Sequence, residues 1–311
     1  MKPKFIETNV LKQLRKNFPK CNIVSYKKFK AGLVNQTYKV MINNPRKTIA
    51  VRMYKSEKAC MTKLNIKLMK YLYKKKLPVP KIYSNDLFAE QGILIMEYIN
   101  GKNALLAYKS GSSELKRNLL TNLGKLMRKI HQLEIPEFWI HHRHEIKNKK
   151  EWIKWTELRI EKYLKFAQAN LDVKYYSFLK EEFIKFSSLL NKDIEFVPMH
   201  WDYHLDNVLV NDQEKIIGVF DFDNSLKGHN LADIGQTMYW LRFQVNDYRN
   251  FIYFLKGYHK KTTEKDRILI RGYFLLHLIA VTRSIWSRKR KFGWIISKHK
   301  KILDEIMRKE I

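Results

Sequence analysis

The residues best suited to chemistry lie in two short segments of the chain, residues 200–207 and residues 220–223. Asp202 precedes Asn207 by five positions, and Asp221 directly follows a short apolar run. A carboxylate placed like Asp202 can orient a hydroxyl group and accept its proton. An amide oxygen and a second carboxylate are hard ligands of the kind that Mg²⁺ takes beside phosphates and water. The spacing therefore predicts a phosphoryl-transfer site with Asp202 as base and with Asn207 and Asp221 as metal ligands.

Each of these residues also has an ordinary structural interpretation. Taken alone, Asp202 is a turn or capping residue, and Asn207 is a loop amide that bonds its own backbone. Asp221 follows a strand-like run and stands beside an aromatic residue, where an acid makes poor core material, and this favours the metal role. Asp223 has two open roles: binding the metal's water shell, or completing a turn with the residues that follow it.

Three neighbours of the motif have weaker assignments. Asp206 adjoins Asn207 but is expected to be exposed to solvent. His200 is expected to hold the loop backbone rather than to transfer protons, although histidine titrates in a useful range. His204 has two equally open roles, one near the phosphates or the acceptor and one structural.

The elements that must position these residues change in character along the chain. An amphipathic helix is expected in residues 1–20, with Phe5, Val10, Leu11, Leu14 and Phe18 at helical spacing. Strand-forming runs and turn signals then predict a hairpin and two later strands. The predicted strands are residues 37–42, 48–54, 81–83 and 92–98, with a helix at 56–76 that the Pro-containing run 77–80 ends.

After residue 100 the sequence is mainly helical. The predicted helices cover residues 112–133, 150–170, 174–190 and 230–245, with further helical segments to the end of the chain. Two short β runs, residues 208–210 and 216–220, surround the motif. This order predicts an α+β fold with an N-terminal nucleotide-binding lobe at 1–98, a catalytic, acceptor-binding helical lobe at 99–311, and a nucleotide cleft between them.

Further motifs are spread over most of the chain. They are Ala-Gly-Leu-Val-Asn-Gln-Thr-Tyr at 31–38, Val-Arg-Met-Tyr at 51–54, Leu-Pro-Val-Pro at 77–80, Ile-Leu-Ile-Met-Glu-Tyr at 93–98, Leu-Gly-Lys-Leu-Met-Arg-Lys-Ile-His at 123–131, His-x-Asp-x₄-Asn at 200–207, Phe-Asp-Phe-Asp at 220–223 and Leu-Ala-Asp at 231–233. Together they resemble the aminoglycoside phosphotransferase and choline kinase superfamily. This branch of the protein-kinase-like fold acts mostly on small molecules and includes homoserine kinase type II, methylthioribose kinase and CotS-like spore-coat proteins.

The resemblance implies a bilobal, protein-kinase-like fold and a Mg²⁺-dependent kinase that uses ATP or GTP. It implies that Asp202 is the catalytic base, that Asn207 and Asp221 bind Mg²⁺, and that Asp233 is a buried acid that braces the catalytic loop. The nucleotide-binding residues that it implies are Gly32 and Asn35 over the phosphates, Arg52 as the phosphate-binding cation, and Met96, Glu97, Tyr98 and Ile99 at the adenine.

The sequence departs from the family pattern at three of these positions. Arg52 stands where lysine is usual, and its planar guanidinium is not equivalent to an ammonium group. Asn65 stands where a glutamate should steady that cation. Trp201 stands where the family often has glycine. The departures leave the base and the metal ligands in place but bear on how the nucleotide is positioned.

Composition sets the broad class of the protein. The chain has 311 residues, of which 45% are hydrophobic, and this is enough for two lobes with real cores. The two cysteines, Cys21 and Cys60, form no metal-binding spacing and fit a reducing compartment. The N-terminus lacks a signal-peptide pattern, and the apolar run at 273–281 is too short to span a bilayer. We therefore expect a cytoplasmic protein without a transmembrane segment.

The formal net charge of +31 bears on partners rather than on fold. It is either a solvated basic surface or a field that attracts anions. The excess of Lys and Arg after residue 251 disfavours a polycationic aminoglycoside and favours a neutral, zwitterionic or anionic hydroxylated metabolite. The basic, aromatic run at 283–294 leaves nucleic acid or a peripheral membrane contact open, although neither is the expected partner. A catalytically idle kinase fold that serves as a scaffold is the main alternative, and the oligomeric state is open.

Overall fold

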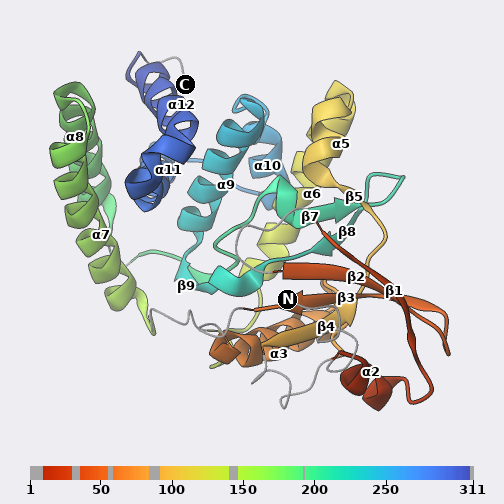
Figure 1. The fold of residues 1–311 in the computed structure, drawn as a ribbon. Coiled ribbons are helices and arrows are strands. Elements are labelled where there is room, and N and C mark those ends of the chain that lie inside the picture. The colour runs from red at the N-terminus through yellow and green to blue at the C-terminus, as the bar shows by residue number, and fades with distance from the viewer. Residues whose placement is uncertain are drawn as a thin grey trace. The chain divides into compact units, whose positions relative to one another are not determined.

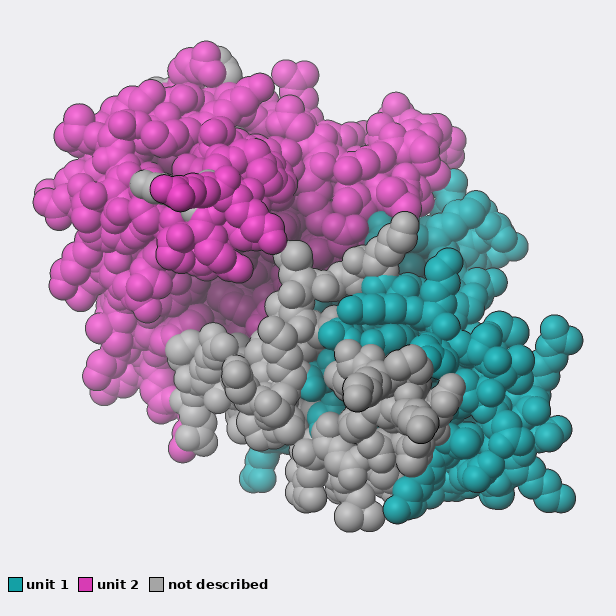
Figure 2. Space-filling model, in the orientation of Figure 1, with its two compact units in different colours: residues 1–103, 137–142, 208–223 teal, residues 104–136, 143–207, 224–311 magenta. Residues whose placement is uncertain are grey.

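The computed structural model describes residues 10–29, 36–54, 59–83, 92–139, 146–191 and 193–308. The chain divides into two compact units, drawn in different colours in Figure 2. Unit 1 holds residues 1–103, 137–142 and 208–223, and unit 2 holds the rest. Unit 1 therefore extends past the expected boundary at residue 98 and takes a second segment around the motif, because short strands at 102–103, 208–210 and 216–219 form one sheet.

Unit 1 is built on a four-stranded antiparallel sheet in the order β1-β2-β3-β4 (Figure 1). A second sheet has the order β5-β7-β8. The elements of this unit are α2 (Leu11–Asn17), β1 (Ile23–Lys28), β2 (Gln36–Ile42), β3 (Lys47–Met53), α3 (Ala59–Lys74), β4 (Ile93–Glu97), β5 (Lys102–Asn103), β7 (Val208–Val210), β8 (Ile216–Val219) and the start of the 3₁₀ helix η4 (Phe222–Asn224).

Alternation along the strands decides which side chains enter the core of unit 1. Val40 and Ile42 on β2 are buried together with Ile49 and Val51 on β3, against Leu14 of α2. Because successive side chains of a strand point to opposite faces, this register turns Arg52 to the other face of the sheet. The apolar pattern thus sets the direction of the Arg52 side chain.

Unit 2 consists mainly of helices, with one two-stranded antiparallel ladder of β6 and β9. In Figure 1, α7 and α8 run side by side. Its elements are α5 (Ala104–Ser110), α6 (Ser113–His131), α7 (Lys149–Asn170), α8 (Val173–Leu189), β6 (Phe196–Met199), η3 (Leu205–Asn207), β9 (Leu226–His229), α9 (Asn230–Val245), α10 (Phe251–Tyr258), α11 (Glu264–Ile285), η5 (Trp286–Arg288) and α12 (Lys289–Met307).

The predicted α+β class is confirmed, and so are most predicted elements. The helices expected at 112–133, 150–170, 174–190 and 230–245 are α6, α7, α8 and α9, each within a few residues of its expected ends. The strand expected at 81–83 is wrong, since only Ile82 forms a single bridge, to Met96. The prediction missed α5, and among the strands it did not assign β1, β5, β6 and β9. Of the helix expected at 1–20, the structure describes α2, and Phe5 lies outside the described residues.

Helix α11 corrects one argument from the sequence. The helical segment 264–288 that contains the apolar run 273–281 is long and apolar enough to cross a membrane by length and composition. The length argument for excluding a span was therefore wrong. However, 61% of its apolar window is buried inside the structure, as in a core helix. Length and composition alone are weak evidence for a membrane span in such a helix.

Candidate active site

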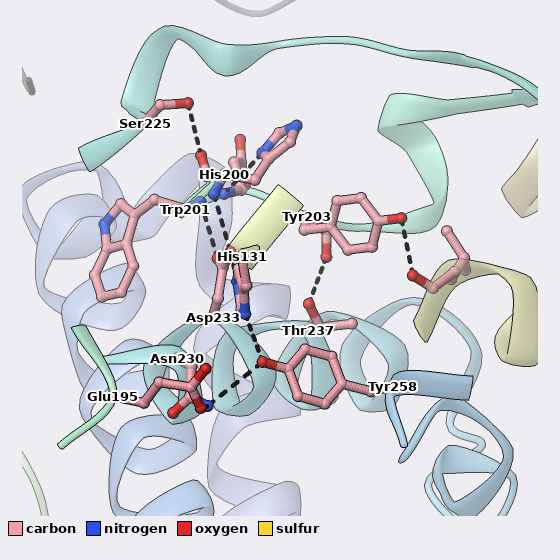
Figure 3. Close-up of polar contacts among 12 residues, drawn as sticks. His131, Glu195, His200, Trp201, Tyr203, Ser225, Asn230, Asp233, Thr237 and Tyr258 are labelled. Atoms are coloured by element: carbon pink, nitrogen blue, oxygen red, sulfur yellow. Dashed lines mark hydrogen bonds and ion pairs between the residues drawn. The ribbon is translucent and has the colours of Figure 1, made fainter. Parts of the chain in front are cut away.

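The predicted catalytic loop of unit 2, residues 200–207, is anchored at its start by the buried carboxylate of Asp233 on α9 (Figure 3). The backbone N–H of His200 donates to Asp233 Oδ2 at 2.9 Å, and that of Trp201 donates to Oδ1 at 2.9 Å. A carboxylate that accepts two backbone donors fixes both the position and the direction of the chain. The expectation that Asp233 braces this loop is confirmed by these two contacts.

Asp233 is itself held from behind by α6 and α10 (Figure 3). His131 at the end of α6 lies 3.2 Å from Asp233 Oδ2 through Nε2 and 2.8 Å from the Tyr258 hydroxyl through Nδ1. The two helices approach closely because Gly124 of α6 faces the backbone of α10 and Gly257 of α10 faces the backbone of α6. A Cβ added at either glycine would collide with that backbone. The helix crossing therefore sets the distance between His131 and Tyr258.

The side chain of His200 serves the loop, as predicted. It is fully buried, and its Nδ1 accepts the backbone N–H of Asp202 at 3.2 Å. The His200 carbonyl accepts a hydrogen bond from the Ser225 hydroxyl at 3.3 Å (Figure 3). Thr237 on α9 donates to the carbonyl of Tyr203 at 2.9 Å. The backbone that leads into Asp202 is thus fixed on both sides.

Trp201 shows why a glycine suits its position. Its φ is +60°, a left-handed backbone conformation that costs a side chain such as tryptophan roughly 1–2 kcal/mol. Its ring packs edge-on against Trp152 at 5.6 Å between centroids and lies 6.0 Å from Trp155. The Arg159 guanidinium lies over both Trp201 and Trp155, at 5.4 and 4.4 Å from the ring centroids. This packing offsets the backbone strain.

Asp202, His204 and Asn207 form one connected group. The amide nitrogen of Asn207 donates to the Asp202 carbonyl at 2.9 Å and lies 3.1 Å from His204 Nε2. The same ring nitrogen lies 3.5 Å from Asp202 Oδ1. Because both contacts use the Asn207 nitrogen, its Oδ1 faces the other way and can act as a ligand oxygen. Asp206 is exposed, as expected, and accepts from Gln244 on α9.

In unit 1, Arg52 makes an ion pair with each acid of the second motif. Its Nη2 lies 2.9 Å from Asp221 Oδ1 and 2.7 Å from Asp223 Oδ2. Burial on its own would lower the pKa of Arg52, but Tyr54, Asp223 and Asp221 together raise it above its usual value. The guanidinium is therefore always charged, and it neutralises two carboxylates that would otherwise repel each other.

Asp223 is the centre of this cluster. It accepts hydrogen bonds from Asn65 Nδ2 at 2.6 Å and from the Tyr54 hydroxyl at 3.1 Å. Burial raises the pKa of Tyr54 far above its usual value, so its hydroxyl remains a donor. Asn65 thus bonds the acid rather than Arg52. A glutamate at position 65 would face Asp223 as a second negative charge, so the arginine, the asparagine and Asp223 form a consistent set.

The remaining predicted nucleotide-binding residues are only partly described. Gly32 and Asn35 lie outside the described residues. Met96 and Glu97 end β4, and the Glu97 N–H already donates to the Lys81 carbonyl at 2.8 Å. The Tyr98 ring stacks on the Phe29 ring, with 6.4 Å between the ring centroids. Ile99 packs against β8 at Gly218, where an added Cβ would lie 3.2 Å from Ile99 Cδ1. The chain at 97–99 is therefore held in unit 1 beside β8.

Residues 25–263 of the chain match the phosphotransferase enzyme family. The chain belongs to this family. The match covers residues 200–207, the Phe-Asp-Phe-Asp segment and Asp233. It therefore includes the group around Asp202 and the cluster around Asp223. A comparison with the curated proteins finds no match.

Solved structures similar to this phosphotransferase share its fold across almost the whole chain. The GDP and kanamycin complex of APH(2")-IIia has 16% identity and a TM-score of 0.72, covering 97% of this chain and 99% of the other. ADP-bound aminoglycoside phosphotransferase APH(2'')-Ib has 18% identity and a TM-score of 0.63, covering 96% and 97%. Macrolide 2'-phosphotransferase type I has 11% identity and a TM-score of 0.65, covering 94% and 96%. At these identities the likeness shows the fold.

Sequence reasoning left two parts of this arrangement undetermined. It left Asp223 with two open roles, whereas the structure places it at the centre of the Arg52 cluster. It also treated Arg52 and Asn65 as separate departures from the family pattern. The signal that could have joined them is that both departures fall on the two elements, β3 and α3, that face the second motif.

Proposed function

We propose that this chain transfers the terminal phosphate of ATP or GTP to a hydroxyl group of a small metabolite, with Mg²⁺. The observation that carries the proposal is the catalytic loop, whose start is fixed by two backbone hydrogen bonds to Asp233 and whose Asp202 and Asn207 are connected through His204. Phosphoryl transfer needs accurate placement and charge neutralisation more than covalent help from the protein. The fixed acid supplies the placement, and the amide oxygen of Asn207 can help to hold a Mg²⁺ ion that neutralises the charge on the phosphates.

Asp202 orients the acceptor hydroxyl and takes its proton. Its side chain is about one-fifth exposed, at 21%, so it can reach a substrate while its backbone stays fixed. His204 lies next to it and can hold the carboxylate in one orientation. A positioned base of this kind contributes about 10²- to 10⁴-fold to the rate.

Asn207 and Asp221 are the proposed Mg²⁺ ligands, and chain connectivity supports their joint action. Asn207 directly precedes β7, whose Val208 pairs with Val219 of β8, and Asp221 follows two residues later. The two donors therefore leave the same end of one hairpin. Among the described residues no group of three or more His, Cys, Asp or Glu could hold a metal alone. Mg²⁺ would take its other ligands from phosphates and water, and would neutralise the charge on the phosphates.

Arg52 is the proposed phosphate-binding cation. Its Nη2 is bound by the two acids, while its Nε is buried without a hydrogen-bond partner among the described residues. A buried donor without a partner is costly, and an incoming phosphate oxygen would satisfy it. Tyr98 and Ile99, with Met96 and Glu97, are the proposed contacts of the nucleobase.

The acceptor is proposed not to be a polycation. Arg159 lies over the ring of Trp201, the residue next to Asp202, and occupies the position over that ring that a bound cation would need. A cationic group of the acceptor bound at this ring would lie close to the Arg159 guanidinium, and the two positive charges would repel each other when partly removed from water. The aminoglycosides named for the similar structures therefore do not transfer to this chain.

A screen of hydroxylated metabolites for nucleotide consumption tests the proposal. Wild-type protein with Mg·ATP or Mg·GTP should show turnover that one class of acceptor stimulates and that EDTA removes. The Asp202→Asn variant should show no stimulation by the same acceptor. Equal stimulation of both proteins would overturn the assignment of the base.

The second candidate is a kinase fold that has lost catalysis and serves as a scaffold. The ion pairs of Arg52 with both acids favour it, because they engage the proposed metal ligand Asp221 in the protein itself. A thermal melt with and without millimolar Mg·ATP or Mg·GTP separates the two functions. A ligand that binds the native state must raise the melting temperature, so no rise with either nucleotide favours the scaffold.

A further inference from the structure

Unit 2 contains a cavity of about 330 Å³ whose walls are rich in lysine. Lys109 from α5, Lys116 from α6 and Lys298 from α12 are among its lining residues. Its volume is at the small end of the range for ligand sites. The cavity is therefore large enough for a small anionic group and is lined by cations that would attract one.

The acid among the lining residues is already engaged. Asp247 accepts a hydrogen bond from the Tyr108 hydroxyl at 2.7 Å and another from Asn250 Nδ2 at 2.8 Å. Asp247, which follows α9, thus links α5 to the start of α10 through hydrogen bonds. Three lysines and one hydrogen-bonded carboxylate leave the cavity with a net positive charge.

The excess of positive charge affects the pKa of Lys298. Burial lowers its pKa below the usual value, and Lys109, Arg242 and Lys301 lower it further. Like charges that depress a lysine in this way are relieved when an anion binds among them. The direction of the shift therefore agrees with the geometry of the cavity.

The cavity is connected to the catalytic loop through one side chain. Gln244 lines the cavity, and its Nε2 lies 3.2 Å from His204 Nδ1 and donates to Asp206 at 3.0 Å. His204 in turn lies 3.5 Å from Asp202. The Oε1 of Gln244 is buried without a hydrogen-bond partner among the described residues. Gln244 and His204 therefore form a chain of contacts from the lining of the cavity to the proposed base.

We propose that this cavity binds an anionic group of the acceptor, a phosphate or a carboxylate, so that the acceptor is an anionic hydroxylated metabolite. The inference rests on the proposed function, since it assigns the acceptor of the same site. The lysines hold the anionic end of the acceptor, and its hydroxyl lies at Asp202, which the contacts through His204 and Gln244 link to the lining of the cavity. A polycationic acceptor would meet the same lysines as repulsion.

Calorimetric titration with inorganic phosphate and pyrophosphate tests the cavity without any need for turnover. The proteins are wild type, Lys298→Gln and Lys125→Gln, which removes an exposed lysine of α6 and changes the net charge equally. We expect Lys298→Gln to weaken binding of at least one anion about tenfold and Lys125→Gln to leave it within about twofold. Equal affinities in the three proteins, or no binding to wild type, would overturn the inference.

A kinetic experiment asks whether the bound anion belongs to the acceptor. Acceptors are compared in pairs that differ only by a phosphate or a carboxylate group. Lys298→Gln should raise KM for the anionic member about tenfold, leave kcat within about twofold, and leave the neutral member unchanged. Inorganic phosphate should compete with the anionic acceptor in wild type. Phosphate that binds at the cavity without raising this KM would overturn the assignment to the acceptor.

The two experiments separate failure of the inference from failure of the proposed function. If wild type phosphorylates neutral acceptors as well as their anionic partners, and Lys298→Gln changes neither, then the function stands and the inference is wrong. If wild type phosphorylates no acceptor although the cavity binds phosphate, then the proposed function is wrong, and the assignment to an acceptor is wrong with it.

Discussion

At the scale of single residues, Arg52 and its two acids show how substitutions in this chain depend on one another. An arginine can bridge two carboxylates through one fork of its guanidinium, whereas the single ammonium of a lysine is a point charge. Here Nη2 contacts Asp221 and Asp223 at the same time, and Asn65 adds a neutral donor to Asp223. The residues at positions 52 and 65 therefore differ from the family pattern as a pair.

Arg52→Ala should lower the free energy of unfolding by about 2 kcal/mol. The change leaves two partly buried carboxylates side by side without a cation, and partial exposure reduces the cost below that of a fully buried pair. Urea unfolding measures the difference. Millimolar Mg²⁺ should restore much of the loss if Asp221 binds this ion, since a divalent cation can replace the guanidinium.

The matched control for this variant is Arg46→Ala, which removes an exposed arginine from the turn between β2 and β3. Its unfolding free energy should stay within about 0.5 kcal/mol of wild type. Similar unfolding curves for the two variants would show that the ion pairs of Arg52 contribute nothing to stability.

The sequence predicted the types of these residues but not their partners. Alternation along β3 turns Arg52 to the face of the sheet opposite to the one that holds the buried Val51, which can be read from the pattern. Asp221 and Asp223, however, are separated from Arg52 by 169 and 171 positions, and no local rule relates such distant residues. The left-handed backbone of Trp201 was equally hidden, because tryptophan gives no sign of positive φ.

At the scale of elements, α11 begins with a complete capping box. The Thr263 hydroxyl accepts the backbone N–H of Asp266 at 3.1 Å, and the Asp266 carboxylate accepts the backbone N–H of Thr263 at 2.9 Å. Lys260 lies 3.1 Å from the same carboxylate. Burial raises the pKa of Asp266, but the hydrogen bonds from Thr263 and Lys260 outweigh burial and lower it below the usual value.

Asp266→Ala should cost about 1 kcal/mol of unfolding free energy at neutral pH. Because the folded pKa of Asp266 lies below the unfolded one, the wild-type advantage is complete above about pH 4 and is lost as the pH falls through the folded pKa. Guanidinium unfolding of both proteins at pH 7 and pH 3 measures this. A difference that grows toward pH 3 would contradict the sign of the shift.

Long helices were the most predictable elements, and short strands the least. Helix α6 carries regular apolar spacing over 19 residues and an N-cap serine, Ser112, so its ends were predicted well. Strands β6 and β9 have only four residues each and contain Pro198 and Gly228, which disfavour a strand assignment. They form because they pair with each other, which tertiary structure alone decides.

At the scale of the whole molecule, the buried His229 and His299 and the half-buried His277 of unit 2 make its stability depend on pH. Burial lowers the pKa of His229, His277 and His299 to about 3 in each case. His299 lies between the hydroxyls of Thr282 and Tyr239, at 2.7 and 2.8 Å. These side chains are neutral in the folded protein at pH 7 and take up protons on unfolding once the pH falls below about 6.5.

His299→Gln should therefore flatten the pH dependence of stability. The depressed pKa of His299 gives a contribution that is fully present above the unfolded pKa and is lost between about pH 6.5 and pH 3, at about 1.4 kcal/mol per pH unit. Urea unfolding at pH 7, 6 and 5 should show a slope smaller by about this amount in the variant. The exposed His259 supplies the control, and His259→Gln should keep the wild-type slope.

Part of the net charge of +31 is concentrated at one place in the molecule. Most lysines face water and affect solubility and association. Those at 109, 116 and 298 instead share a cavity that Gln244 joins to the catalytic loop. Composition indicated an attraction for anions, but only the structure distinguishes a solvated surface from a cavity, because the three lysines come from three different helices.

The most direct test of the central claim compares initial rates of nucleotide-dependent phosphorylation for wild type, Asp202→Ala and Asp212→Ala, with nucleotide affinity measured in parallel. Asp212 is the control because its side chain is 87% exposed in the turn between β7 and β8. We predict that Asp202→Ala lowers kcat at least about 100-fold, that its nucleotide Kd stays within about threefold, and that Asp212→Ala matches wild type. An Asp202→Ala protein that keeps wild-type kcat would contradict the account.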